Sequence, residues 1–415
     1  MKAMRRLAKE RTYEYLRLTY FVRFLGDAFF YTFLYVFLAS LGFGTDKLGL
    51  IAALSPFAAL LGNITFQRIA KNLEVNRILM FIFSIIEMTI ALIFFVFPKQ
   101  PFVFYAIIIT CVSTINGPFY SLLDGYSGTY ISERNKQYSS MRVMGTLSYV
   151  IGPLIGGFLV DNTGAGFQTL FLMSSVFYII TSFLIYYLPK QKIELHIIVP
   201  PEEKKRLKII GKPELIAYLL FNFFVIGVTV VTDNFFGIYL RTELGVTTTQ
   251  FGYIVAIAIA IEAGVMFLLS LRKNNSFRMP AFSFFFIGIF LLIRPLVIVL
   301  NLSPTWTMVL SVFRGIAWGY YIVFNVRFLA RVVPLKHLTK ALLTGSIATT
   351  SSRIITSLII GESLKHHSYQ TVFFCSMFSV VFGMTISMII AEVDRRKQKK
   401  VDMIVPFIEK DQDLN

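Results

Sequence analysis

The chain passes from one apolar segment to the next through Asp124-Gly-Tyr-Ser-Gly-Thr-Tyr-Ile-Ser-Glu-Arg-Asn-Lys-Gln-Tyr138-Ser-Ser-Met-Arg142. A carboxylate ends the first segment, a polar and basic turn follows, and an arginine opens the second segment. We expect the two segments to be antiparallel helices, which places both charges at a similar depth. Ionisable side chains inside membrane helices are costly, so they usually face a cavity, form pairs or take part in function. The stretch therefore predicts a membrane fold with a functional ion pair. A pair that only holds two helices together is the alternative.

The composition is that of a membrane protein. Hydrophobic residues make up 56% and charged residues 15% of the 415 residues, whereas about a quarter of a typical soluble domain is charged. Apolar runs of about 20 residues, the length that crosses a bilayer, recur along the whole chain. The first of these runs is full length, so we expect no cleaved signal peptide. The two cysteines, Cys111 and Cys375, lie inside apolar segments, so we predict no disulfide and no metal site.

The hydrophobic pattern predicts an all-α membrane protein with twelve transmembrane helices. We place them at 14–39, 47–67, 77–97, 102–125, 138–160, 167–188, 213–240, 250–271, 279–298, 305–330, 340–361 and 369–391. Thirty of the 40 Lys and Arg residues lie at the termini, in the loops after even-numbered helices or within one turn of those helix ends, and four lie in or next to the opposite loops. Because such an excess marks the cytoplasmic side, we predict that both termini are cytoplasmic. The net charge of +17 is thus a topology signal, and we predict no nucleic-acid partner.

The chain repeats itself weakly. Leu41-Gly-Phe-Gly-Thr-Asp-Lys-Leu-Gly49 follows the first predicted helix, and Leu244-Gly-Val-Thr-Thr-Thr-Gln-Phe-Gly252 follows the seventh. Ile115–Asp124 can likewise be aligned with Ile316–Asn325, which puts Asp124 opposite Asn325. Two six-helix halves in parallel repeat are the plan of major facilitator transporters. We predict an N-terminal bundle at 1–189, a cytoplasmic linker at 190–212, a C-terminal bundle at 213–395 and a cytoplasmic tail at 396–415.

The sequence disfavours an enzyme. It contains no glycine-lysine loop of the type that holds ATP phosphates, so we expect no direct use of ATP. Its four histidines, at positions 196, 337, 366 and 367, fall in predicted loops or at helix ends. We see no nucleophile with an adjacent base and no metal-ligand cluster, and we predict no cofactor. A secondary transporter, driven by a solute or ion gradient, is favoured.

Ionisable residues inside the predicted helices are the candidate functional residues: Arg23, Asp27, Glu87, Asp124, Arg142, Asp233, Glu262, Arg294, Arg314 and Arg353. Arg327 lies near the cytoplasmic end of its helix, where we expect its side chain to reach the membrane surface, and we assign it no function. Arg23 and Asp27 lie four residues apart and can meet on one helix face. On the tenth predicted helix, Arg314, Trp318 and Tyr321 form one polar and aromatic face with Asn325, of the kind that lines a cavity. Glu87 has two open interpretations, a functional group or a bridge between helices.

Several of these motifs resemble a known family. Tyr138–Tyr149 resembles the start of the fifth helix in lactose-permease-like proton symporters. In that group an acidic residue eighteen positions before the arginine binds sugar hydroxyls together with it. The resemblance implies this role for Asp124 and Arg142.

The second half resembles the related group of oligosaccharide, nucleoside and phenylpropionate permeases. The matching stretches are Phe251-Gly-Tyr, Glu262-Ala-Gly-Val-Met-Phe, Arg294, Arg314-Gly and Asn325-Val-Arg-Phe-Leu-Ala-Arg-Val-Val-Pro334. Two departures stand out. Members of the group often have histidine where Arg314 stands, so a histidine-based proton relay is not implied. The segment Gly62–Lys71 lacks the acidic residue of the usual signature between the second and third helices.

We therefore predict a proton symporter of the cell membrane, monomeric in the bilayer, for a sugar or nucleoside. The predicted solute-binding residues are Asp124, Arg142, Tyr120, Asp27, Trp318, Tyr321 and Asn325. Glu262 is predicted to carry the proton, poised by Arg294, with Asp233 in reserve. An efflux antiporter for amphipathic compounds is the alternative, because Gly152-Pro-Leu-Ile-Gly-Gly157 resembles a motif of drug–proton antiporters. The same motif also fits close helix packing. A non-transporting receptor is a third and less favoured class.

Overall fold

The computed structural model describes residues 2–70, 72–132, 138–188, 212–271, 280–333 and 338–412. Within these ranges every regular element is a helix, so the predicted all-α class is confirmed. The first half contains α1 (Lys2–Tyr31), α2 (Leu34–Ser40), α3 (Thr45–Ile69), α4 (Leu73–Val96), α5 (Phe102–Ser132), α6 (Tyr138–Asn162) and α7 (Phe167–Tyr186). The second half contains α9 (Pro213–Phe221), the π-helix η2 (Asn222–Gly227), α10 (Val228–Thr242), α11 (Thr248–Leu271), α12 (Pro280–Val299), α13 (Pro304–Val332), α14 (Leu338–His366) and α15 (Tyr369–Gln412). Most of the predicted linker lies outside the described residues.

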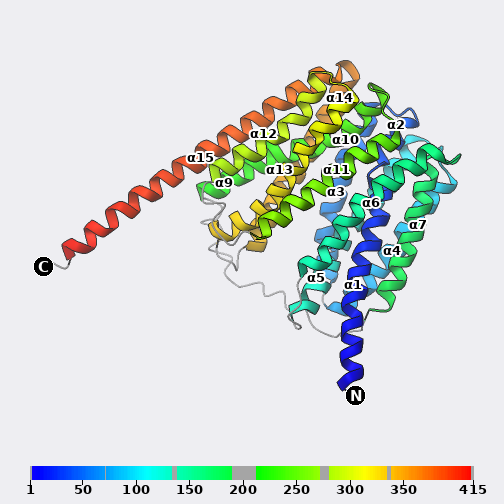
Figure 1. Ribbon diagram of the computed structural model, residues 1–415, viewed down its shortest axis with the longest axis horizontal. Helices are drawn as coiled ribbons and strands as arrows, with labels where there is room; N and C mark the ends of the chain where they lie inside the picture. Colours follow the sequence, from blue (N-terminus) through cyan, green and yellow to red (C-terminus); the bar gives the residue numbers. More distant parts are fainter. Residues whose placement is uncertain are drawn as a thin grey trace.

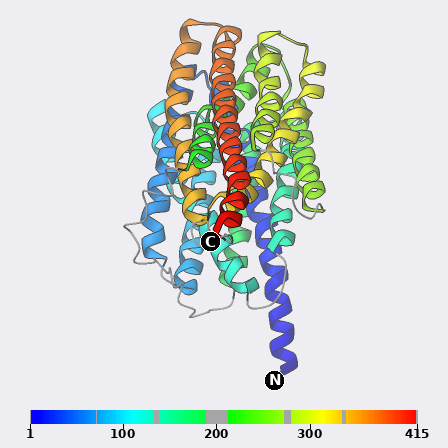
Figure 2. The same cartoon turned by 90° about the vertical axis from the view of Figure 1, so that its left-hand side faces the viewer.

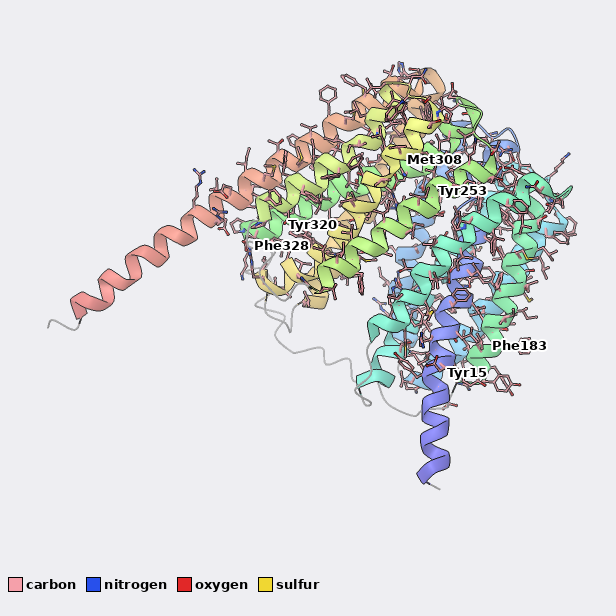
Figure 3. The ribbon with its side chains drawn as sticks, viewed as in Figure 1. Tyr15, Phe183, Tyr253, Met308, Tyr320 and Phe328 are labelled. Carbon is pink, nitrogen blue, oxygen red and sulfur yellow. The ribbon has the colours of Figure 1, made fainter. Side chains whose placement is uncertain are left out.

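Twelve segments of the described chain are long enough to cross a membrane. Eleven of them, in the described part of the chain, are both long and apolar enough to do so. The twelfth, α14, has 29 residues, a length of about 43 Å at the helical rise, but its many Ser and Thr residues make it less apolar. Aromatic side chains such as Phe183, which is 57% exposed, project outwards from the bundle (Figure 3), as lipid-facing residues do.

Several helices differ from the prediction in extent or continuity. The first predicted helix is broken after Tyr31, and a short second helix follows it. The seventh keeps its predicted start but contains the π-helix η2 in its middle. The last continues to Gln412, beyond the predicted end at 391, because Glu, Lys, Arg and Gln favour helix as strongly as many apolar residues do. Hydrophobicity marks where a helix leaves the bilayer and not where it ends.

The helices form two groups (Figure 1). Helices α1–α7 lie on one side and α9–α15 on the other, and the groups meet at one end and diverge towards the end from which the termini extend. Figure 2 shows the N- and C-terminal helices reaching towards that same end. The halves pack through α3 against α14 and through α6 against α11. The pairing matches the predicted repeat, since α3 and α11 follow equivalent loops.

Glycines allow the halves to approach closely where they meet. A Cβ atom on Gly49 of α3 would lie 2.5 Å from the carbonyl oxygen of Ser357 on α14. A Cβ atom on Gly252 of α11 would overlap the carbonyl oxygen of Pro153 on α6. Small residues at such crossings are what close packing of membrane helices requires. One buried cluster crosses both halves in this region and includes Phe37, Phe94 and Phe235.

Candidate functional site

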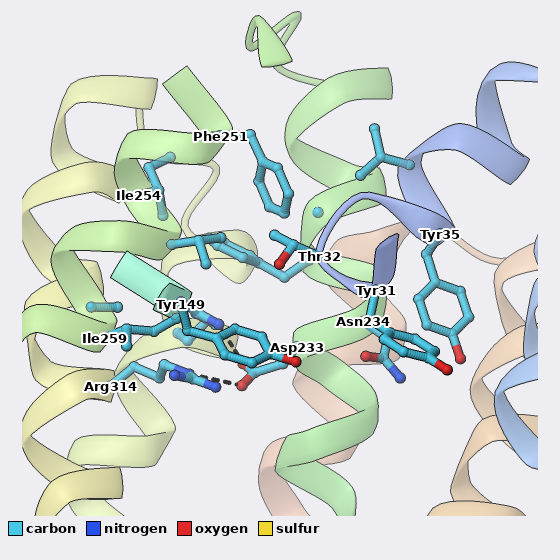
Figure 4. A pocket seen from close by; sticks show the side chains of 16 residues that line it. Tyr31, Thr32, Tyr35, Tyr149, Asp233, Asn234, Phe251, Ile254, Ile259 and Arg314 are labelled. Atoms are coloured by element: carbon cyan, nitrogen blue, oxygen red, sulfur yellow. Dashed lines mark hydrogen bonds and ion pairs between the residues drawn. The ribbon is translucent and has the colours of Figure 1, made fainter. Parts of the chain in front are cut away.

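A cavity of about 290 Å³ lies between the halves (Figure 4). The N-terminal half contributes Tyr31, Thr32 and Tyr35, from around the break between α1 and α2, together with Tyr149 of α6. The helix break therefore places three polar side chains on the cavity wall. The C-terminal half contributes residues of α10, α11, α12 and α13, among them Asp233, Asn234, Phe236, Phe251, Arg294 and Arg314.

Two arginines hold one carboxylate on the C-terminal wall of the cavity. Arg294 of α12 donates from Nη1 to Oδ1 of Asp233 at 2.5 Å, and Arg314 of α13 donates from Nε to Oδ2 of the same residue at 2.9 Å. Arg314 also lies 3.5 Å from Oε2 of Glu262 on α11. This corrects the predicted contact between Glu262 and Arg294: the partner of Glu262 is Arg314, and Arg294 binds Asp233. With two acids and two arginines, this network is balanced in charge.

A second cluster is sealed inside the N-terminal half. Arg23, Asp27 and Glu87 each have 0% exposure. Arg23 bonds Glu87 through Nη1 and, at 2.7 Å, from Nη2 to Oε1, and its Nε lies 3.3 Å from Oδ2 of Asp27. Asp27 also accepts hydrogen bonds from Tyr120 and, at 2.8 Å, from Tyr178. Two carboxyl groups thus share one guanidinium. Asp27 and Tyr120, both predicted to bind solute, do not line the cavity in this conformation.

Asp124 and Arg142 do form the predicted pair. The distance between Arg142 Nη1 and Asp124 Oδ1 is 3.7 Å, and the two side chains are 45% and 39% exposed. Asp124 also accepts a hydrogen bond of 2.6 Å from Tyr20, and the Arg142 guanidinium lies 4.9 Å from the centre of the Phe24 ring. The pair does not line the cavity described above; it lies on α5 and α6, away from the residues that do.

The predicted equivalence of Asp124 and Asn325 has a structural counterpart. In the first half Tyr20 of α1 donates to Asp124 of α5, and in the second half Tyr218 of α9 donates to Asn325 of α13. In each half a tyrosine of the first membrane segment bonds a polar residue of the fourth. The repeat therefore extends to individual hydrogen bonds, with an acid in one half and an amide in the other.

The polar and aromatic face of the tenth membrane helix is present, but part of it points into its own half. Trp318 lies beside Arg314, with the guanidinium 5.5 Å from the ring centre. Tyr321 donates to Oδ1 of Asn222 at 2.5 Å, and Thr349 of α14 donates to the same oxygen at 3.1 Å. Asn222 begins the π-helix, an element that often marks functional positions. Sequence reasoning missed Asn222, although an amide inside an apolar helix was a usable signal.

The sequence reasoning also missed Tyr31, Tyr35 and Tyr149. Tyr149 lies seven residues after Arg142, hence on the same helix face, and its spacing was a signal. Tyr31 and Tyr35 had no comparable signal, because the chain around the helix break is aromatic and apolar apart from Thr32.

The comparisons with known proteins agree with this architecture. The sequence profile of the MFS_1 like family matches residues 13–401. No curated protein sequence matches the chain. Among solved structures, a mutant of the nucleoside transporter NupG covers 91% of this chain and 99% of its own at 12% identity, with a TM-score of 0.74. A bacterial homolog of the human lysosomal transporter Spinster, inward-facing and occupied, is 14% identical over 93% and 97% of the chains, with a TM-score of 0.69. A bacterial homologue of the iron transporter ferroportin, inward-facing, is 12% identical over 92% and 98%, with a TM-score of 0.66.

Proposed function

We propose that this chain, which belongs to the MFS_1 like family and is a multi-pass membrane transporter, moves a small polar organic solute by proton symport. The observation that carries the proposal is the cavity between the halves, whose wall combines aromatic rings with a network of carboxylates and arginines. A binding site at the interface of the two repeats is where such transporters hold their solutes. The neighbouring folds are those of transporters and not of enzymes.

The cavity favours a small solute with hydroxyl groups and a ring. Its volume of about 290 Å³ lies at the lower end of the range for ligand pockets, which disfavours bulky amphipathic drugs. Tyr31, Tyr35 and Tyr149 offer hydroxyls as well as ring faces. A sugar or nucleoside framework fits these features, and a nucleoside transporter is among the structural neighbours. Asp124 and Arg142 supply a second polar site for such a solute on the side from which the termini extend.

Glu262 is the acidic group best placed to exchange a proton. Asp233 is held by two short ion pairs, whereas Glu262 has one contact of 3.5 Å and is 18% exposed. Its helix, α11, packs against α6 of the other half, so movement of the halves changes its surroundings. A carboxylate that gains and loses contact with a cation binds and releases a proton in turn. We assign Arg314 the role of that cation, with Arg294 fixing Asp233.

We propose that both termini are cytoplasmic and that the divergent end of the molecule opens to the cytoplasm, as the Lys and Arg bias indicates. The protein is then inward-facing, in a cell membrane. Reporter fusions at position 200 and at the C-terminus should report cytoplasm, and a fusion near position 365 should report the outside. An odd number of crossings between the first two would contradict the two-half arrangement.

The motif that raised the efflux alternative has a packing explanation. A Cβ atom on Gly152 would lie 2.5 Å from Cβ of Ala28, and one on Gly157 would lie 2.5 Å from the carbonyl oxygen of Thr248. These glycines hold α6 against α1 in one half and against α11 in the other. The motif therefore does not require drug transport.

The function is tested by reconstituting the purified protein in liposomes. Uptake of radiolabelled sugars and nucleosides is measured with and without an inward proton gradient, and lipophilic cationic dyes are included. We expect a polar solute to accumulate only when the gradient is present. Dye extrusion without any uptake of a polar solute would favour the efflux alternative.

A further inference from the structure

Arg353 is a cation inside a membrane helix without an acidic partner. It lies near the middle of α14, and no carboxylate of the described residues is within ion-pair distance. Its Nε is buried and makes no hydrogen bond within the part of the chain that the structure describes. The other deeply placed arginines differ: Arg23 has Glu87, and Arg294 and Arg314 share Asp233. Arg353 therefore has no counter-charge among the described residues.

Its position is at the interface of the two halves. Residues four apart lie on one helix face, so Arg353 shares a face with Ser357, which packs against Gly49 of α3. It lies one turn from that contact, towards the divergent end. Its charge also acts on Tyr35, whose side chain lines the cavity (Figure 4). Arg353 does not itself line the cavity in this conformation, so we place its guanidinium at the interface of the halves, behind the part of the wall that Tyr35 forms.

The charges around the cavity do not balance once Arg353 is counted. Asp233 and Glu262 offset Arg294 and Arg314, so Arg353 leaves one positive charge in excess. An uncompensated charge in a membrane interior is costly and marks solute or ion pathways. One monovalent anion in the cavity would remove the excess.

We propose that Arg353 binds a carboxylate of the transported solute, with the Tyr35 hydroxyl as a second donor. The solute is then a small polar organic acid with a single negative charge, such as a sugar acid, and neutral sugars or nucleosides bind more weakly. This inference rests on the proposed transport function and narrows its solute class.

Two features favour a carboxylate over a phosphate. With Glu262 ionised, one excess positive charge matches a monoanion, whereas a phosphate monoester carries nearly two negative charges at neutral pH. The planar guanidinium also matches the two oxygens of a carboxylate. Symport of one proton with one monoanion moves no net charge, so uptake should be insensitive to membrane potential.

The inference is tested by the thermal stability of the purified full chain in detergent. Benzoate is the probe, benzamide is its uncharged counterpart, and phenyl phosphate tests the other oxyanion, all at matched pH and ionic strength. We expect benzoate to raise the apparent melting temperature of the wild type by roughly 2 °C or more beyond benzamide, as binding of a ligand to the folded state alone does. The benzoate effect should be lost in Arg353→Gln and partly kept in Arg353→Lys. Arg327→Gln is the matched control, because Arg327 bonds the carbonyl of Leu269, and it should respond like the wild type.

Equal responses of the wild type and Arg353→Gln, or no response of the wild type to benzoate, would overturn the inference. A larger response to phenyl phosphate than to benzoate would overturn the carboxylate assignment. Because Arg353 has no acidic protein partner, Arg353→Gln without ligand should melt no lower than the wild type, so a lost response is not a folding defect. The melting assay measures binding and does not depend on transport. A benzoate response without proton-driven uptake would contradict the proposed symport. Symport of a neutral sugar without a benzoate response would contradict only this inference.

Discussion

Replacing Arg23 by Gln should destabilise the protein far more than replacing Glu87 by Gln. The cluster that contains them has two carboxyl groups and one guanidinium, all at 0% exposure. It is neutral when one of the two carboxyl groups holds a proton. Arg23→Gln removes the only cation of the cluster, whereas Glu87→Gln replaces one acid by a neutral group of the same shape.

The structure sets the size of the difference. Removing one member of a buried ion pair typically costs about 3–5 kcal/mol, because a buried charge is left uncompensated. That range applies to Arg23→Gln, since both Glu87 and Asp27 depend on its guanidinium. Glu87→Gln keeps an oxygen that accepts from Arg23 and from Asn116 and leaves one acid against one cation. Its cost should stay near the net worth of a single hydrogen bond, about 1 kcal/mol.

The two variants are compared by denaturant titration in mild detergent, with circular dichroism as the signal. Arg17→Gln is the matched control, because Arg17 lies on the same helix and pairs with the exposed Glu14 at 3.0 Å. Exposed pairs contribute about 0–1 kcal/mol, so this control should stay close to the wild type. If Glu87→Gln unfolds as readily as Arg23→Gln, the cluster does not hold a shared proton and the charge count is wrong.

Three further predictions concern transport and the closure of the two halves. Glu262→Gln, which mimics the protonated acid, should lose accumulation against a gradient but keep solute exchange; a variant that still accumulates would exclude Glu262 as the proton site. Asp124→Asn and Arg142→Gln should each abolish uptake, and the double charge swap should fail to restore it if both groups contact solute in a fixed geometry; recovery to near the wild-type rate would indicate a helix clamp. Gly252→Ala should hold the halves apart and raise the labelling of engineered cysteines at the end where they meet, whereas Gly315→Ala, which crowds two helices within one half, should lower stability without that labelling.

The fold was largely predictable from the sequence, and its local interruptions were not. Long apolar runs have few alternatives in a bilayer, since only helices and closed barrels satisfy the backbone there. The alignment of Asp124 with Asn325 also predicted an equivalence that hydrogen bonds from Tyr20 and Tyr218 now display. The break after Tyr31 has no such cause in the local sequence. It arises where the chain must fit tertiary contacts, which a single segment does not encode.

The charged residues of the candidate site were predictable in their membership and only partly in their pairing, whereas its tyrosines were missed. Sequence reasoning identified Asp233, Glu262, Arg294 and Arg314, and the structure brings all four into one network. Sequence reasoning assigned Glu262 the wrong partner, because Arg294 and Arg314 lie at comparable depth. The rotation of each helix about its axis decides which of the two arginines Glu262 contacts. That rotation depends on packing between helices, and hydrophobicity alone does not fix it.

The strengths of the contacts indicate which parts move. The shortest ion pairs of the described residues lie within a half, as in the Arg23 and Asp233 clusters. Between the halves the polar contacts are more exposed: Lys365 lies 3.8 Å from Asp46 with both side chains partly exposed, and such pairs contribute little. Asp161 at the end of α6 also caps α11 of the other half, accepting from the backbone N–H groups of Thr248 and Thr249 at 3.3 and 2.7 Å. A cap of this kind is worth about 1 kcal/mol, which motion between states can exchange for water. The halves are thus held rigid internally by buried charge, and the polar contacts that join them break at low cost, which suits the proposed transport by rocking of two bundles around a central solute.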